Sequence, residues 1–464
     1  MSPDSTVTTW HTTGARLPVS VVRLGSPDRS QNENPLWNRS ENPSNQTRLP
    51  PGAMKSLHRL FGVATFCLAA VTAFAQVVRA PDPPAPNYFA IMAWGTSPSD
   101  PEQLGLMREV GLNVSGFCRV DDLEAVQRAG LSCFVSDWRI NGYDWANLPD
   151  ESEIRRNIAS VAEAVRGHPA MIGFQLLDEP HASLMPALGK VAAILREMLP
   201  DAWPYVNLFP HHAGASATGT PSYDTYVRML VDVIRQPFLS YDHYALVNGQ
   251  MMNSFYTNLE IVRRVGLETG TPFWNVILAN THFSYMDPSD ATLNLQVYST
   301  LAYGGRGIQY FTYFTPAIGN YRSAAIDWFG NKTPTWDMLR RINQQIHALA
   351  PTLVNLRSTG VYHHPVAPPE GQPLSQSKLV ASIALTRNAP EPPPFLVGEF
   401  EDGRGRPYLL LVNKDLNNSY RFAIQLRRAG AGLIRISPYS GREQPLGREM
   451  DWLAPGAGVL LRVE

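Results

Sequence analysis

The sequence has few cysteines and no excess of either charge. Only three of its 464 residues are Cys, and none lies in a C-x-x-C pair or a Cys/His cluster. A disulfide framework, a structural zinc site and thiol redox chemistry are therefore not expected. Lys and Arg total 39 against 40 for Asp and Glu. This balance argues against nucleic acid or an anionic membrane as a partner, because both require clustered positive charge.

The chain is nevertheless rich enough in apolar residues to fold. Hydrophobic residues make up 44% and charged residues 17% of the sequence, which excludes disorder of the whole chain. A length of 464 residues accommodates two or three domains of about 100–200 residues each.

The N-terminal segment is predicted to lie outside the working protein. Residues 1–53 show no apolar periodicity and are predicted to be disordered, upstream of a second start at Met54. Residues 54–75 have a basic start, an apolar stretch and an A-x-A end, the layout of a secretory signal peptide cleaved near Ala75–Gln76. The apolar stretch Leu60–Ala73 is shorter than the about 20 residues of a membrane span. We therefore expect a secreted or periplasmic protein; the alternative is a disordered tail before a buried helix.

After a Pro-rich linker at 76–86, apolar strand-like segments alternate with helical patterns. The strand-like segments are 88–94, 114–120, 132–138, 171–180, 203–209, 238–244, 272–279 and 307–314. They are near-continuous apolar runs, as expected for strands buried on both faces, and helices between strands require parallel pairing. The sequence therefore predicts an α/β fold, a (β/α)₈ TIM barrel over residues 87–350. A doubly wound open sheet is the competitor, but no strand is followed by a G-x-G-x-x-G or Walker loop.

Residues 355–464 have a different pattern. Short strand-like segments are separated by turn residues, and no helical period is visible. This pattern predicts a small antiparallel β-sandwich appended to the barrel.

Chemistry in such a barrel is expected at the carboxyl ends of the strands and in the loops that follow them. Carboxylates, imidazoles and aromatic rings dominate the residues there. The candidate site residues at this rim are Trp94, Asp137, Trp138, Asp178, Glu179, His211, Asp242, His243, Tyr244, Asn280, His282 and Tyr313. Aromatic rings stack on the apolar faces of sugars, and a pair of carboxylates is what cleavage of a glycosidic bond requires. A carbohydrate partner is therefore predicted, with an O-glycosidic bond in an oligo- or polysaccharide as the target.

Neither a metal nor a cofactor is predicted. The histidines do not have the H-x-x-x-H spacing of a metal pair, although His211, His243 and His282 follow different strands and could converge. His363 and His364 belong to the predicted sandwich and are expected at its surface.

Glu179 is the leading catalytic candidate. It directly follows the apolar run of the fourth strand and precedes Pro180. A Glu in a half-apolar position has a raised pKa and can act as a general acid. The structural alternative is a carboxylate that satisfies a helix N-terminus. Its neighbour Asp178 is expected to point the opposite way, because side chains alternate along a strand.

Two short segments resemble clan A glycoside hydrolases. GFQLLDEP, which contains Glu179, resembles the Asn-Glu-Pro signature of the fourth strand, and LSYDHYAL resembles the sixth strand. The barrel with a β-sandwich tail is also similar to family 42 β-galactosidases. The resemblance implies that Glu179 is the acid/base and that His243 and Tyr244 line the sugar site. Asp178 departs from the family by replacing the Asn, and the seventh strand, PFWNVILANTH, lacks the family's nucleophilic carboxylate.

The second carboxylate is therefore an open question with three answers. Asp242, at the end of the sixth strand, is our first choice as base or nucleophile, at a spacing that would suit an inverting reaction through water. Asp287, in the loop after the seventh strand, is the second. The third is a glycan-binding barrel that does not cleave its ligand.

Cys118 and Cys133 fall in consecutive predicted strands. A disulfide between them is conceivable in an exported protein, but we favour two buried thiols.

Overall fold

The computed structural model describes residues 88–385, 392–446 and 452–464. The predicted disordered segment, signal peptide and linker (1–53, 54–75 and 76–86) lie outside the described residues. Within the described part of the chain, no helix is both long and apolar enough to cross a membrane.

Eight parallel strands form the inner layer of the first domain, in the order β5-β4-β3-β2-β1-β10-β9-β6. Their bounds are Ala90–Ala93 (β1), Val114–Cys118 (β2), Ser132–Val135 (β3), Met171–Asp178 (β4), Trp203–Asn207 (β5), Leu239–Asp242 (β6), Phe273–Leu278 (β9) and Gly307–Phe311 (β10). The two outer strands meet at the Leu208–Tyr241 bridge, where the Leu208 N–H donates to Ser240 O at 2.9 Å. The sheet is thus a closed barrel, and the predicted fold class is confirmed.

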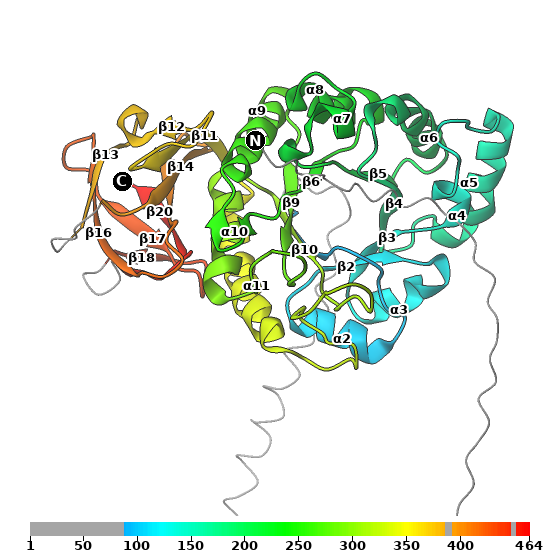
Figure 1. Ribbon diagram of the computed structural model, residues 1–464, viewed down its shortest axis with the longest axis horizontal. Helices are drawn as coiled ribbons and strands as arrows, with labels where there is room; N and C mark the ends of the chain where they lie inside the picture. Colours follow the sequence, from blue (N-terminus) through cyan, green and yellow to red (C-terminus); the bar gives the residue numbers. More distant parts are fainter. Residues whose placement is uncertain (1–87, 386–391, 447–451) are drawn as a thin grey trace, which may run out of the picture. The chain divides into compact units, whose positions relative to one another are not determined.

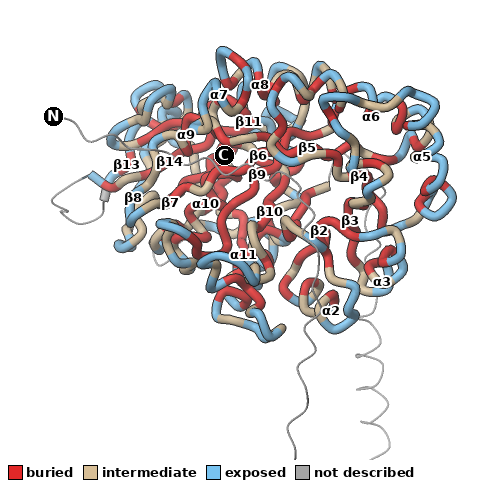
Figure 2. Tube along the Cα trace, turned by 45° about the vertical axis from the view of Figure 1, so that its right-hand side comes forward, coloured by how far each residue is buried: buried red, intermediate tan, exposed pale blue. Residues whose placement is uncertain are grey.

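Helices surround this barrel (Figure 1). They are Pro101–Glu109 (α2), Leu123–Arg128 (α3), Trp138–Asn141 (α4), Glu151–Val165 (α5), Met185–Met198 (α6), Gly214–Thr218 (α7), Tyr223–Met229 (α8), Ser254–Thr269 (α9), Asp290–Ala302 (α10) and Pro334–Leu353 (α11). A short hairpin, Leu246–Val247 (β7) and Gln250–Met251 (β8), lies between β6 and α9. The burial pattern follows this arrangement: the strands are buried and the outer helix faces are exposed (Figure 2).

Helix α11 illustrates why these segments are helical. Thr333 caps its N-terminus, and Pro334 occupies the first turn, where its missing N–H is not needed. Leu339, Ile342 and Ile346 recur at helical spacing and are buried. The same face carries a polar link, because the buried Asn343 side chain donates to Val110 O at 2.9 Å. This pairing satisfies a polar group that burial would otherwise penalise.

The barrel interior contains a lower aromatic layer and an upper polar layer. In the lower layer Phe238 and Trp274 stack with ring centroids 3.9 Å apart. In the upper layer Tyr205 donates to Gln309 Oε1 at 2.7 Å, and Gln309 Nε2 donates to Ser240 Oγ at 2.9 Å. This polar layer is the floor beneath the carboxyl ends of the strands.

The seam between β5 and β6 is completed by a side chain. Gln236 Oε1 accepts from the Val206 N–H at 2.7 Å, and Gln236 Nε2 donates to Val206 O at 3.2 Å. The amide of Gln236 therefore supplies the donor and acceptor that a neighbouring strand residue would supply.

Residues from Leu356 onward form two β-sheets. The larger has the order β12-β11-β14-β15-β20-β17-β18 and the smaller β13-β16-β19. The bounds are Leu356–His364 (β11), Gln372–Pro373 (β12), Val380–Leu385 (β13), Phe395–Asp402 (β14), Pro407–Asn413 (β15), Tyr420–Leu426 (β16), Leu433–Ile436 (β17), Glu443–Pro445 (β18), Trp452–Leu453 (β19) and Gly458–Val463 (β20). All described pairs are antiparallel except the short β11–β12 pair. The predicted antiparallel β domain is confirmed.

One predicted surface residue of this domain is buried. His363 is fully buried, and its Nε2 lies 2.9 Å from the Tyr303 hydroxyl, just beyond α10. Lys414 Nζ lies 3.4 Å from His363 Nδ1. The surface prediction for His363 is wrong because its strand packs against barrel residues, so the inward side chain finds polar partners there.

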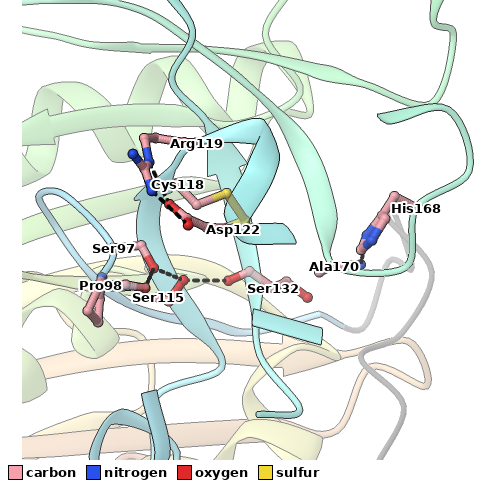
Figure 3. The surroundings of a disulfide bond; sticks show 10 residues. Ser97, Pro98, Ser115, Cys118, Arg119, Asp122, Ser132, His168 and Ala170 are labelled. Carbon is pink, nitrogen blue, oxygen red and sulfur yellow. Dashed lines mark hydrogen bonds and ion pairs between the residues drawn. A yellow bond between two sulfur atoms is a disulfide. The ribbon is translucent and has the colours of Figure 1, made fainter. Parts of the chain in front are cut away.

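The prediction of two buried thiols is also wrong. Cys118 and Cys133 form a disulfide, with Cα atoms 6.1 Å apart (Figure 3). Cys118 pairs with Val135 in the sheet, two residues along β3 from Cys133. The two cysteines are therefore diagonal neighbours on one face, close enough for a bond.

Candidate active site

Glu179 follows directly after β4 and has an unusual backbone conformation. Its φ is +47°, which is uncommon for a residue with a side chain. Its N–H still donates to Asn207 O, at 2.9 Å, so β5 holds it in place. Backbone strain of this kind persists where the surroundings enforce it, commonly at functional sites.

The turn at Glu179 brings two neighbouring carboxyl groups to the same mouth. Asp178 Oδ1 accepts from Asn207 Nδ2 at 3.2 Å, and Asp242 Oδ1 accepts from the same nitrogen at 3.2 Å. Glu179 is itself hydrogen-bonded to Asp242. The expectation that Asp178 points away is therefore wrong, because the positive φ interrupts the alternation of the strand.

Asn207 organises this cluster, and sequence reasoning missed it. It ends β5, between the strands that carry Glu179 and Asp242. Its Oδ1 accepts from Ser240 Oγ at 2.9 Å, which fixes the orientation of the amide and aims its N–H groups at the two acids. The available signal was a polar residue inside the apolar segment WPYVNLF.

Glu179 and Asp242 have opposite protonation near neutral pH. Burial, followed by the negative charges of Asp242 and Asp178, raises the pKa of Glu179 to about 9. Asp242 is 8% exposed; its burial raises its pKa to about 6, and the hydrogen bonds from Glu179 and Asn207 limit the rise. Glu179 therefore donates its proton to the Asp242 carboxylate. Two acids whose pKa values are pushed apart are the pattern of an acid and a base.

Asp178 is the third member of the cluster. Its side chain faces the open mouth and keeps contact with solvent. Loss of hydration next to the surrounding protein, followed by the negative charge of Asp242, raises its pKa to about 7. The hydrogen bond from Asn207 opposes this rise. Its negative charge favours the protonated form of Glu179.

An aromatic wall continues from Asp242 around the mouth. Tyr244 donates to Asp242, and its ring stacks on Phe311 with centroids 5.4 Å apart. His282 lies edge-on to Tyr244 at 5.9 Å, and Trp94 approaches Phe311 at 5.6 Å. The structure therefore brings Trp94, Tyr244 and His282 to the side of the carboxyl cluster. Phe311, the shared contact of this wall, was not predicted, because it ends an apolar strand.

The polar side chains after β9 are hydrogen-bonded to one another and to the next strand's loop. Asn280 Oδ1 lies 2.8 Å from His282 Nδ1, and Asn280 Nδ2 donates to Thr312 Oγ1 at 3.0 Å. Burial lowers the pKa of His282 to about 4, so its imidazole is neutral near neutral pH. Asp287 accepts from Thr281 Oγ1 at 2.5 Å and forms an ion pair with Arg322 at 3.5 Å. Asp287 is thus engaged by its own loop and by the loop after β10, and not by Glu179.

Three candidates on other strands have different partners. Asp137 caps α4 and forms an ion pair with Arg139 at 2.8 Å, and this contact lowers its pKa. Trp138, next to it, is 76% exposed. Tyr313 is buried, with its hydroxyl accepting from Trp336 Nε1 at 3.1 Å. The structure does not bring these side chains to the carboxyl cluster.

The two remaining histidine candidates pack against other rings. His243 follows Asp242 and points away from it; its ring is fully buried between His212 and Phe255. The His211 ring lies edge-on to Tyr223, with centroids 5.5 Å apart. Among the described residues, no group of three or more His, Cys, Asp or Glu side chains is arranged to hold a metal ion.

Comparison with known proteins gives structural likeness at low identity. No protein-family model matches the chain, and no curated protein matches its sequence. The solved structures similar to it include a β-galactosidase from the psychrophilic Marinomonas ef1 (11% identity, TM-score 0.46, 59% of this chain and 63% of that one). Others are Saccharomyces cerevisiae Gas2p in complex with laminaritriose and laminaritetraose (14%, 0.40, 55% and 63%), and a glycoside hydrolase (12%, 0.49, 81% and 92%). The chain thus spans less than two thirds of the first two, and the site rests on its own residues.

Proposed function

We propose that the protein is a glycoside hydrolase that cleaves an O-glycosidic bond, with Glu179 as general acid and Asp242 as the second carboxylate. The observation that carries this proposal is the hydrogen-bonded Glu179–Asp242 pair at the barrel mouth, whose surroundings raise the pKa of Glu179 above that of Asp242 and so favour a protonated Glu beside an ionised Asp. Glycosidic cleavage requires these two states: a proton for the leaving oxygen and an anion for the sugar carbon.

The contact between the two groups supports direct attack. Inverting enzymes keep their carboxyl groups about 6.5–9.5 Å apart to hold a water, and retaining enzymes about 5–5.5 Å. Glu179 and Asp242 are hydrogen-bonded to each other, a contact closer than either spacing and nearer to that of retaining enzymes. Asp242 is therefore assigned as nucleophile, in place of the water-mediated inverting role expected from the sequence.

Substrate entry changes the proton's acceptor. The glycosidic oxygen displaces Asp242 from the Glu179 hydroxyl, and the freed Asp242 carboxylate attacks the anomeric carbon as Glu179 protonates the leaving group. Asn207 and Tyr244 hold Asp242 during this exchange. Water then hydrolyses the glycosyl ester, with the Glu179 carboxylate as base.

Asp178 and the aromatic wall supply binding. Asp178 faces the mouth with one oxygen on Asn207, which leaves acceptor positions for sugar hydroxyls. Its charge also keeps the proton on Glu179. The rings of Trp94 and Tyr244 offer apolar faces next to the acids.

Export through a signal peptide at residues 54–75 belongs to the same proposal. The Cys118–Cys133 disulfide supports it, because disulfides persist mainly in secreted and periplasmic proteins.

A glycan-binding protein without turnover is the second candidate. The closed Asn280–His282 pair at the end of β9 favours it, because clan A glycoside hydrolases, which this barrel resembles, carry their nucleophile at that strand.

Hydrolysis of a glycan panel separates the two candidates. Reducing-sugar release is measured for the wild type, Glu179→Gln, Asp242→Asn and a matched control, Asp144→Asn, at an exposed loop position. A general acid is worth about 10²–10⁴-fold, so Glu179→Gln should lose that much while Asp144→Asn keeps full activity. Azide should restore the activity of the Asp242→Asn variant and yield a glycosyl azide as the product. Binding without hydrolysis in the wild type would favour the second candidate, and full activity of Asp242→Asn would remove Asp242 from the mechanism.

A further inference from the structure

Phe283 combines features that folding does not account for. It lies in the loop after β9, its side chain is 72% exposed, and its φ is +46°. A bulky residue in the left-handed region is an outlier. Hydrophobic stabilisation scales with the apolar area removed from water. An exposed ring therefore contributes little free energy to offset the cost of this backbone conformation.

The surrounding loops enforce that conformation. The Phe283 N–H donates to Asn320 Oδ1 at 3.0 Å. The loops after β9 and β10 are joined by Thr281 and Arg322, whose N–H groups donate to each other's carbonyl oxygens at 2.8 and 2.9 Å. Asp287 contacts the Thr281 hydroxyl and the Arg322 guanidinium. Two loops and an ion pair thus hold one exposed aromatic ring in place.

The ring is continuous with the aromatic wall of the mouth. The rings of Phe283 and His282 lie 5.2 Å apart. His282 in turn contacts Tyr244 at 5.9 Å and Tyr285 and Phe311 at 4.8 and 5.8 Å, and it stacks on Tyr321 at 4.6 Å. Tyr244 donates to Asp242. Phe283 is therefore two ring contacts from Tyr244, at the exposed end of the aromatic wall.

We propose that Phe283 and Tyr321 form a platform for a second sugar ring, so that the site takes an oligosaccharide or a longer chain rather than a monosaccharide unit alone. This inference rests on the proposed function, because the carboxyl cluster fixes where the first sugar lies. The exposed face of Phe283 stacks on the apolar face of the second ring, and Tyr321, backed by His282, limits how that ring tilts. Phe283 is a specificity-determining residue that does not touch the reacting atoms.

Two variants at one position separate binding from folding. Phe283→Ala removes the ring. Phe283→Gly removes the ring and also relieves the backbone, because Gly adopts positive φ without steric penalty. Tyr439→Ala is the matched control, since Tyr439 is an exposed aromatic (85%) in the β domain. Calorimetric binding of cello-, laminari-, galacto- and xylo-oligosaccharides is compared with hydrolysis of glycosyl fluorides, which are monoglycosides whose leaving group carries no ring.

The platform predicts that the variants lose affinity only for ligands longer than one sugar. Both Phe283 variants should bind the oligosaccharide preferred by the wild type about tenfold more weakly or worse, the range for truncating an aromatic anchor. Monoglycoside hydrolysis should be unchanged, and Phe283→Gly should unfold at a urea concentration no lower than the wild type. Equal oligosaccharide affinity in the wild type and both variants would overturn the platform, even if the wild type hydrolyses monoglycosides. If the wild type binds the oligosaccharide without hydrolysing it, and both variants lose this binding, the platform is supported and the proposed catalysis is refuted.

Discussion

Replacing Glu179 by Gln should change how stability depends on pH. The ordinary pKa of 4.5 is raised to about 9 in the folded protein, so between these values the folded state holds a proton that the unfolded state has released. Stability from this group is therefore complete below about pH 4.5 and is lost as the pH rises towards 9. Gln cannot titrate, and its amide can still donate to Asp242, so the variant should lack this dependence.

The size of the effect follows from proton linkage. One proton contributes at most about 1.4 kcal/mol to the free energy of unfolding per pH unit, or about 3 kcal/mol between pH 6 and pH 8. Glu179 is partly exposed and shares its proton with Asp242, so solvent screening reduces this limit. We expect the wild type to lose about 1–3 kcal/mol relative to Glu179→Gln over this interval.

Urea unfolding at pH 6, 7 and 8 measures this difference directly. Glu163→Gln is a suitable control, because Glu163 is exposed on α5 and is not a member of the carboxyl cluster. The control should follow the wild-type curve at every pH. Parallel pH dependence of Glu179→Gln and the wild type would refute the assignment of a retained proton to Glu179.

Three further predictions test neighbouring features. The pH profile of kcat/KM on a cleaved glycan should rise near pH 6, as Asp242 ionises, and fall near pH 9, as Glu179 loses its proton. Asp178→Asn should move the alkaline limb to lower pH, and an unmoved limb would contradict the effect of the Asp178 charge on Glu179. Replacing Cys118 and Cys133 by Ala should lower the free energy of unfolding in urea by about 3 kcal/mol, the value for a loop of about 15 residues, and a reductant should affect only the wild type. Burial lowers the pKa of Lys414 to about 8 from 10.5, so the unfolded state binds the extra proton between these values and stability should rise with pH there; Lys414→Met should flatten this rise in urea titrations at pH 8 to 10.

The fold could be predicted because its pattern is local. Eight apolar runs separated by helical periods leave few arrangements that bury both faces of every strand, and the closed barrel is the one found. The change to short strands after the barrel was equally visible. These features depend on hydrophobic periodicity, which a sequence carries directly.

The site was predictable only where a side chain ends a strand. Glu179 and Asp242 were identified because acids directly after apolar runs lie at the rim of a barrel. Asp178 was misplaced because alternation holds only while the backbone remains extended, and the positive φ of Glu179 ends it. No local sequence pattern predicts a positive φ for a residue other than glycine.

Residues that act through distant partners were beyond local reasoning. Asn207 bridges acids on two other strands, and Cys118 finds Cys133 through the register of two strands. His363 is buried by residues that precede it by dozens of positions in the sequence. Each depends on the sheet register or on the packing between domains, which periodicity does not specify.

The seam between β5 and β6 has a consequence for motion. One backbone bridge, the Gln236 amide and the Asn207 side chain join these strands, whereas β4 and β5 share a longer ladder. Glu179 is attached to the β4–β5 side of the seam and Asp242 to β6. A change in the spacing of β5 and β6 would therefore change the spacing of the two acids directly. Because the Asn207 side chain contacts Asp178 on one side of this seam and Asp242 on the other, it ties the geometry of the acids to the closure of the barrel.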